Sequence, residues 1–120
     1  HAVYATLFAL AHDPIPAVIE EVVVYLGGEV PIWDYKLTAP AELGDEVAAK
    51  LADRGAALVA NHGLVTCAAT VDKALHNAAL VERTAKIVWG TRAMGGTIHP
   101  LPEKVNRNMA GVYKFIRENP

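Results

Sequence analysis

Apolar residues recur three and four positions apart in several segments of the chain, which is the spacing that places them on one face of a helix. Val3, Leu7 and Leu10 show this spacing and predict a helix over residues 2–11. A proline-containing turn follows, because proline removes a backbone donor and restricts the residue before it. The apolar run after the turn predicts a second helix over residues 16–26, which a pair of glycines ends.

Three more helices are predicted further along. The segment 40–54 has apolar residues on one face and charged residues elsewhere. The longest helix is predicted from Val71 to about Met94, with Thr70 as its N-cap, and a terminal helix is predicted over residues 103–118. The predicted inner face of the longest helix comprises Ala74, Leu75, Ala78, Val81, Ala85 and Val88.

Short apolar runs between these helices predict strands over residues 30–37, 56–60 and 64–69, the last two joined by the turn Asn61-His62-Gly63. Helices that alternate with strands predict an α/β protein. Two or three short strands make a small sheet. The sequence also begins at His1 rather than at methionine, which indicates either a processed N-terminus or a piece of a longer chain. The short supply of strands favours a missing upstream segment.

Composition narrows the possible classes of protein. The 120 residues are 52% hydrophobic and 20% charged, which predicts one domain over residues 1–120, with a C-terminal linker and helix over residues 97–120. The net charge of −2 comes without a basic face, so neither a nucleic acid nor a membrane is expected as a partner. The longest apolar run is too short for a membrane span. Cys67 is the single cysteine, which favours a reducing compartment, the cytoplasm.

His62 is the residue with the clearest signal for chemistry. It lies in a turn that directly follows a buried strand, where rigid scaffolds present functional side chains, and Gly63 permits a close backbone approach. The alternative is a structural turn histidine held by hydrogen bonds, which is the more common role of a lone histidine. His1 is a second candidate ligand, whereas His12, His76 and His99 lie in a turn, on a helix and in a linker. Zinc needs three or four ligands, and no third one is evident.

Glu20 and Glu21 lie among valines in the second predicted helix, and one of them is expected to face inward or toward a partner subunit. A carboxylate in apolar surroundings has a raised pKa, which suits a general acid or base. A solvated helix face is the alternative interpretation. Tyr4, Tyr25, Tyr35 and Tyr113 are candidate proton donors, although aromatic side chains more often pack in cores or interfaces.

Several short motifs occur in a fixed order along residues 1 to about 93. They are His1-Ala2-Val3-Tyr4-Ala5-Thr6, Ile15-Pro16-Ala17, Gly27-Gly28, Val30-Pro31, Tyr35, Glu42-Leu43, the strand and turn Leu58-Val59-Ala60-Asn61-His62-Gly63-Leu64-Val65, and Ala74, Glu82 and Ala85. In this order and spacing they resemble the second half of the class II aldolase/adducin domain, the family of L-fuculose-1-phosphate aldolase and L-ribulose-5-phosphate 4-epimerase.

The resemblance implies a fold and a metal site. The fold would be a class II aldolase-like three-layer α/β/α arrangement with a mainly antiparallel central sheet, incomplete at the N-terminus. A divalent ion would be held by three histidines, of which His1 and His62 match two. The third would lie two positions before His1. Zinc is the expected ion, with manganese, magnesium and cobalt as alternatives.

The resemblance also implies a reaction. The chain would be a metal-dependent lyase of carbohydrate metabolism, in which the ion stabilises the enediolate left when a carbon–carbon bond breaks. The expected substrate is a sugar phosphate or a related hydroxy-ketone. Several members take an acid/base residue from a neighbouring subunit of a homotetramer, and Glu20 or Glu21 matches that position. Tyr113 is a further candidate, since some members use a tyrosine near the C-terminus.

Other functions remain open at the level of sequence. Relatives with the same metal site act as decarboxylases, epimerases or dehydratases. A non-catalytic, adducin-like interaction domain is a second alternative, although such domains lose the metal histidines. A plain structural α/β domain is a third, and it requires that His1 and His62 lie far apart in space.

Overall fold

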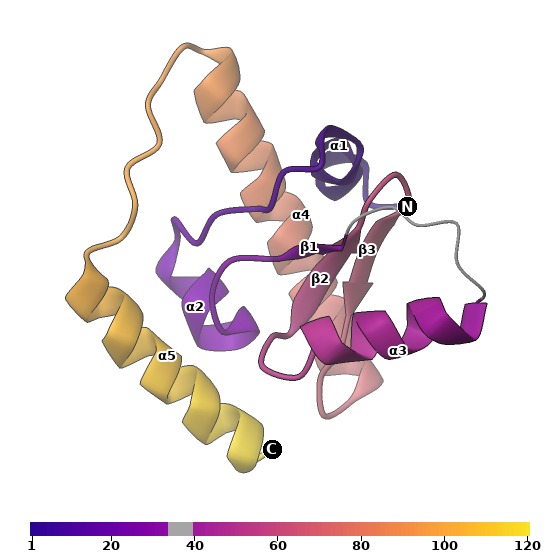
Figure 1. Cartoon of the computed structure of the whole chain (residues 1–120). Coiled ribbons are helices and arrows are strands. Elements are labelled where there is room, and N and C mark those ends of the chain that lie inside the picture. The colour runs from indigo at the N-terminus through magenta and orange to yellow at the C-terminus, as the bar shows by residue number, and fades with distance from the viewer. Residues whose placement is uncertain (34–39) are drawn as a thin grey trace.

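A three-stranded sheet of order β1-β2-β3 lies at the centre of the computed structural model, which describes residues 1–33 and 40–120 (Figure 1). β1 (Ile32–Trp33) pairs in parallel with β2 (Ala56–Val59), and β2 pairs antiparallel with β3 (Gly63–Thr66). Every residue of β2 is buried, as a continuous apolar run predicts for a strand covered on both faces.

Five helices surround this sheet in the described part of the chain. They are α1 (Val3–Ala11), α2 (Glu20–Leu26), α3 (Pro40–Lys50), α4 (Val71–Ala93) and α5 (Glu103–Glu118). Figure 1 shows α3 in front of the strands and α4 behind them, while α2 and α5 pack together at one side. This arrangement confirms the predicted three-layer α/β/α class. None of the helices in the described part of the chain is long and apolar enough to span a membrane.

The inner face of α4 differs from the predicted one. Val81, Ala85 and Val88 are buried as expected, but Leu75 is 68% exposed. The buried stripe begins a turn later and includes three residues that the pattern missed: Asn77, Leu80 and Thr84. The two polar ones are accommodated because Asn77 Nδ2 donates to the Cys67 carbonyl and Thr84 Oγ1 donates to the Leu80 carbonyl.

α2 begins at Glu20 rather than at Pro16. Ile15 forms an isolated antiparallel bridge with Val30, with backbone hydrogen bonds in both directions at 3.1 and 2.9 Å. This long-range pairing keeps the chain extended beyond the proline turn and delays the helix. α2 ends as predicted, because Gly27 adopts a left-handed φ of 90° that stops a helix.

Two further boundaries were predicted too long. α3 ends at Lys50 rather than Arg54, because backbone bonding tightens to an i−3 bond from Ala52 to Ala49. β3 ends at Thr66, because the carbonyl of the next residue, Cys67, accepts the Asn77 side chain instead of a strand partner. The strand predicted over 30–37 begins at Ile32, and residues 34–37 of it, with Tyr35, lie outside the described residues.

Candidate functional site

The turn that carries His62 joins β2 to β3. Asn61 enters it with a left-handed φ of 60°, and Gly63 leaves it with a φ of 153°. The His62 backbone N–H donates to the Val59 carbonyl at 3.0 Å, which closes the turn. The His62 side chain is exposed, so its imidazole is presented to solvent at the end of a buried strand.

His1 lies beside this turn. The ring centroids of His1 and His62 are 5.9 Å apart, with 31° between the ring planes. His1 and His62 are 61 positions apart in the sequence, yet the fold brings their rings together at one edge of the molecule. Within residues 1–33 and 40–120, no three histidine, cysteine, aspartate or glutamate side chains gather closely enough to hold a metal ion. The described part of the chain therefore offers two neighbouring imidazoles at this edge.

The turn runs antiparallel along α1. The Asn61 backbone N–H donates to the Ala9 carbonyl at 3.0 Å, near the C-terminal end of the helix. Gly63 lies nearer its N-terminal end, where a Cβ on Gly63 would be 3.6 Å from both His1 Cδ2 and Thr6 Oγ1. α1 is thus the element that places His1 relative to His62.

α4 holds the N-terminal end of α1. Glu82 Oε1 accepts a hydrogen bond from the Ala5 backbone N–H at 2.8 Å. The first amide groups of a helix lack partners within the helix, and Ala2 at the N-cap makes no side-chain hydrogen bond. A carboxylate from another helix therefore takes the role that a local capping residue usually has.

Glu20 and Glu21 lie at the start of α2, on another side of the molecule. Figure 1 shows α2 well separated from the N-terminus, where His1 lies. Both carboxylates are exposed, and Glu21 forms an ion pair with Arg83 of α4 at 2.7 Å. Neither glutamate faces the interior of its own chain, because Val22, Val23 and Leu26 occupy the buried face of α2.

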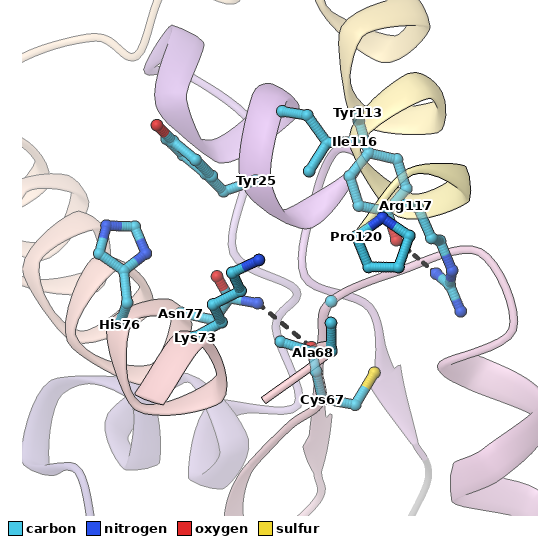
Figure 2. Close-up of a pocket in the computed structure, with 12 residues that line it drawn as sticks. Tyr25, Cys67, Ala68, Lys73, His76, Asn77, Tyr113, Ile116, Arg117 and Pro120 are labelled. Atoms are coloured by element: carbon cyan, nitrogen blue, oxygen red, sulfur yellow. Dashed lines mark hydrogen bonds between the residues drawn. The ribbon is translucent and has the colours of Figure 1, made fainter. Parts of the chain in front are cut away.

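Tyr113 lines a cavity of about 560 Å³ at the opposite end of the β2–β3 hairpin from His62 (Figure 2). Its ring packs on Gly27, where a Cβ would come within 2.7 Å of Tyr113 Cε2. The Tyr113 hydroxyl accepts a hydrogen bond from the Arg117 guanidinium. The walls come mainly from α4, α5 and the segment after β3, with Tyr25 from α2, and they include Lys73, His76 and Ile116. The structure therefore does not join Tyr113 to the histidine pair of the same chain.

The other histidines and the cysteine have separate environments. His12 Nε2 forms a hydrogen bond with Asn61 Oδ1 at 2.5 Å. His76 makes an edge contact with Tyr25, with ring centroids 5.0 Å apart, and His99 is exposed in the linker before α5. Cys67 is half-buried just after β3, and its thiol donates a hydrogen bond to the Arg54 carbonyl oxygen at an S···O distance of 3.6 Å.

Sequence patterns missed two sets of residues around the histidine pair. Glu82 carries no local signal for its contact with Ala5, since 77 positions separate the two. His12 and Asn61 are residue types that tolerate a left-handed backbone, and each lies at the end of a predicted element. That local signal marks both as turn residues but does not reveal that they contact each other.

Comparison with known proteins gives three concordant findings. The family model for the Class II Aldolase and Adducin N-terminal domain matches residues 1–89. An L-fuculose phosphate aldolase from Escherichia coli O6:H1 is 33% identical over 104 residues, which are 87% of this chain and 48% of that protein. A solved structure of L-fuculose 1-phosphate aldolase superposes with a TM-score of 0.80 at 29% identity, covering 93% of this chain and 52% of the other.

A further relative acts on a different sugar phosphate. It is a 5-methylthioribulose-1-phosphate/5-deoxyribulose-1-phosphate aldolase from Rhodospirillum rubrum, 33% identical over 89 residues, which are 74% of this chain and 40% of that protein. The chain thus spans about half the length, or less, of the curated relatives that it matches.

Proposed function

This chain belongs to the class II aldolase and adducin family, and on that premise we propose that it supplies part of the active site of a divalent-metal-dependent lyase. The reaction would be the aldol cleavage of a carbon–carbon bond in a sugar phosphate or related hydroxy-ketone. The observation that carries this proposal is the proximity of His1 and His62, whose ring centroids lie 5.9 Å apart.

The spacing of the two imidazole rings is compatible with a shared metal ion. Two imidazoles that each bond one zinc ion through a nitrogen at about 2.1 Å have centroids roughly 5–6 Å apart at a tetrahedral angle. The spacing of His1 and His62 falls in that range. A plain structural domain with distant histidines is disfavoured for the same reason. A third ligand would come from the part of the relatives' length that this chain does not span. Zinc is the first choice of ion, with manganese, magnesium and cobalt as alternatives.

When bound, the ion would act as a Lewis acid toward negative charge that develops on the substrate as the bond breaks. His1 and His62 would hold the ion through their neutral ring nitrogens. A carboxylate from a second subunit would move the proton, for which Glu20 is the first candidate and Glu21 the second. The exposure of both carboxylates, away from the histidines of their own chain, supports a role in a neighbour's site. Tyr113, packed on Gly27, is a weaker candidate.

The proposed enzyme is a cytoplasmic homo-oligomer, a tetramer by family resemblance, with its sites between subunits. Large apolar side chains on the surface of α1 and α5 support a protein–protein contact, since Val3 is 65% exposed and Phe115 66% exposed. We further propose that residues 1–120 are part of a single class II aldolase domain, within which residues 97–120 form its C-terminal linker and helix. The first substrates to test are L-fuculose 1-phosphate and 5-deoxyribulose 1-phosphate, because similar proteins are aldolases named for these sugar phosphates.

Metal analysis of the full-length protein, with His62→Ala as the matched variant, tests the proposal. We expect about one divalent ion per chain in the wild type, a loss of most of that metal in His62→Ala, and loss of aldol cleavage with it. Circular dichroism should show that the variant keeps its fold, because the His62 side chain is exposed. A wild-type protein that binds no metal would favour an adducin-like interaction domain. Metal binding without aldol cleavage would direct screening to decarboxylase, epimerase and dehydratase substrates.

A further inference from the structure

Two residues next to the histidine site share an uncommon backbone conformation. Among the described residues, His12 and Asn61 are the only ones other than glycine with a positive φ, at 53° and 60°. They are also bonded to each other, through His12 Nε2 and Asn61 Oδ1 at 2.5 Å. With the amide in this orientation, His12 carries the hydrogen on Nε2 and donates it. Residues held in sparsely populated conformations cluster at functional sites when the surroundings over-determine them.

The pair joins the two segments that carry the imidazoles. His12 ends α1, whose other end is preceded by His1, and Asn61 directly precedes His62. A second bond, from the Asn61 backbone N–H to the Ala9 carbonyl at 3.0 Å, acts in parallel with the side-chain bond. The chain from His1 to His12 and the turn from Asn61 to Gly63 therefore lie side by side, tied at the C-terminal end of α1.

The imidazoles themselves lack a comparable anchor. In the part of the chain that the structure describes, no side-chain hydrogen bond holds the ring of His1 or His62, and both side chains are exposed. Metal-binding histidines are usually oriented by a hydrogen bond to the ring nitrogen that does not bind the ion. The positions of these two rings thus depend on how their backbones are placed. The backbone of His1 is placed by α1, and that of His62 by the turn.

We propose that His12 and Asn61 are a positioning pair that sets the spacing of the His1 and His62 imidazoles. This inference rests on the proposed metal-dependent function. Breaking the pair frees Asn61 from its left-handed conformation and lets the turn move relative to α1. The imidazoles then converge less often, so metal affinity falls although neither ligand has been changed.

Zinc affinity of the full-length protein tests this, measured by competition with a chromophoric chelator, alongside the visible absorption of the Co²⁺-loaded protein. We expect His12→Ala to weaken Zn²⁺ binding about tenfold or more and to shift the Co²⁺ bands, as changes behind metal ligands typically do. The exchange variant His12→Asn/Asn61→His re-creates the pair in the opposite order, with two residue types that tolerate a left-handed backbone. We expect it to recover most of the lost affinity.

His99→Ala is the matched control, since His99 is an exposed histidine in the linker, and it should bind Zn²⁺ like the wild type. Thermal unfolding of the metal-free proteins separates positioning from stability. His12→Ala with wild-type affinity and an unchanged Co²⁺ spectrum would overturn the positioning role and leave the proposed function standing, as would a folded exchange variant that recovers nothing. If His12→Ala fails to fold, the exchange variant alone decides. A wild-type protein without metal affinity would overturn both proposals.

Discussion

At Gly63 the backbone conformation of the turn determines which residue is tolerated. Its φ of 153° is a conformation that residues with a Cβ rarely adopt. The space around it is less restrictive, because a Cβ there would meet His1 and Thr6 at 3.6 Å, an ordinary contact distance. The glycine is thus required by the turn that presents His62, and not by the proximity of the His1 ring.

Gly63→Ala should lower stability through backbone strain. We expect a loss of about 1–3 kcal/mol in the free energy of unfolding, measured by urea denaturation of the full-length protein. Gly90→Ala is the control, because Gly90 lies inside α4 and no atom outside its own helix lies within 4 Å of a built Cβ. Alanine there should be stabilising by about 0.5–1 kcal/mol. Equal effects at the two positions would contradict the conformational argument.

α1 is the element on which the geometry of the histidine pair depends. Its C-terminal end is tied to the β2–β3 turn through Asn61, and its N-terminal end is capped by Glu82 of α4. It has no acidic residue in its first turn and no side-chain cap of its own. Its stability is therefore tertiary in origin, which agrees with the general weakness of short isolated helices.

Glu82→Ala should lower the free energy of unfolding by about 1 kcal/mol, the usual cost of losing a helix cap. Glu82→Gln should cost less, because an amide oxygen can still accept the Ala5 N–H but lacks the negative charge that favours a helix N-terminus. Urea denaturation of both variants measures the difference. A Glu82→Ala protein as stable as the wild type would show that solvent can cap α1 equally well.

At the scale of the whole molecule, the histidine pair and the candidate acid/base residues lie in different places. His1 and His62 meet at one end of the β2–β3 hairpin, whereas Glu20 begins a helix on another side. One chain by itself therefore does not assemble the proposed chemistry. An oligomer resolves this separation when Glu20 of one subunit reaches the histidines of another, since closed symmetric assemblies repeat such a contact at every interface.

Co-expression of two inactive full-length variants, His62→Ala and Glu20→Gln, tests this arrangement. If each site combines histidines from one subunit with a glutamate from its neighbour, random mixing leaves roughly a quarter of the sites intact. The mixed oligomers should therefore regain cleavage activity that neither variant shows alone. Combining the separately purified variants without subunit exchange is the control. Mixed oligomers that remain inactive would place both residues in a single chain's site, or remove Glu20 from the mechanism.

Local sequence patterns were sufficient for α1, α4, α5 and the β2–β3 hairpin, because apolar spacing, the Thr70 cap and the Asn61-His62-Gly63 turn all act over a few residues. They also marked His62 as a candidate ligand. Only the tertiary structure decided the start of α2, which depends on the pairing of Ile15 with Val30. It likewise decided the 5.9 Å approach of His1 to His62 and the contact of His12 with Asn61. These features join residues distant in sequence, so no local preference encodes them, and they form only when the core packs and brings α1 against the hairpin.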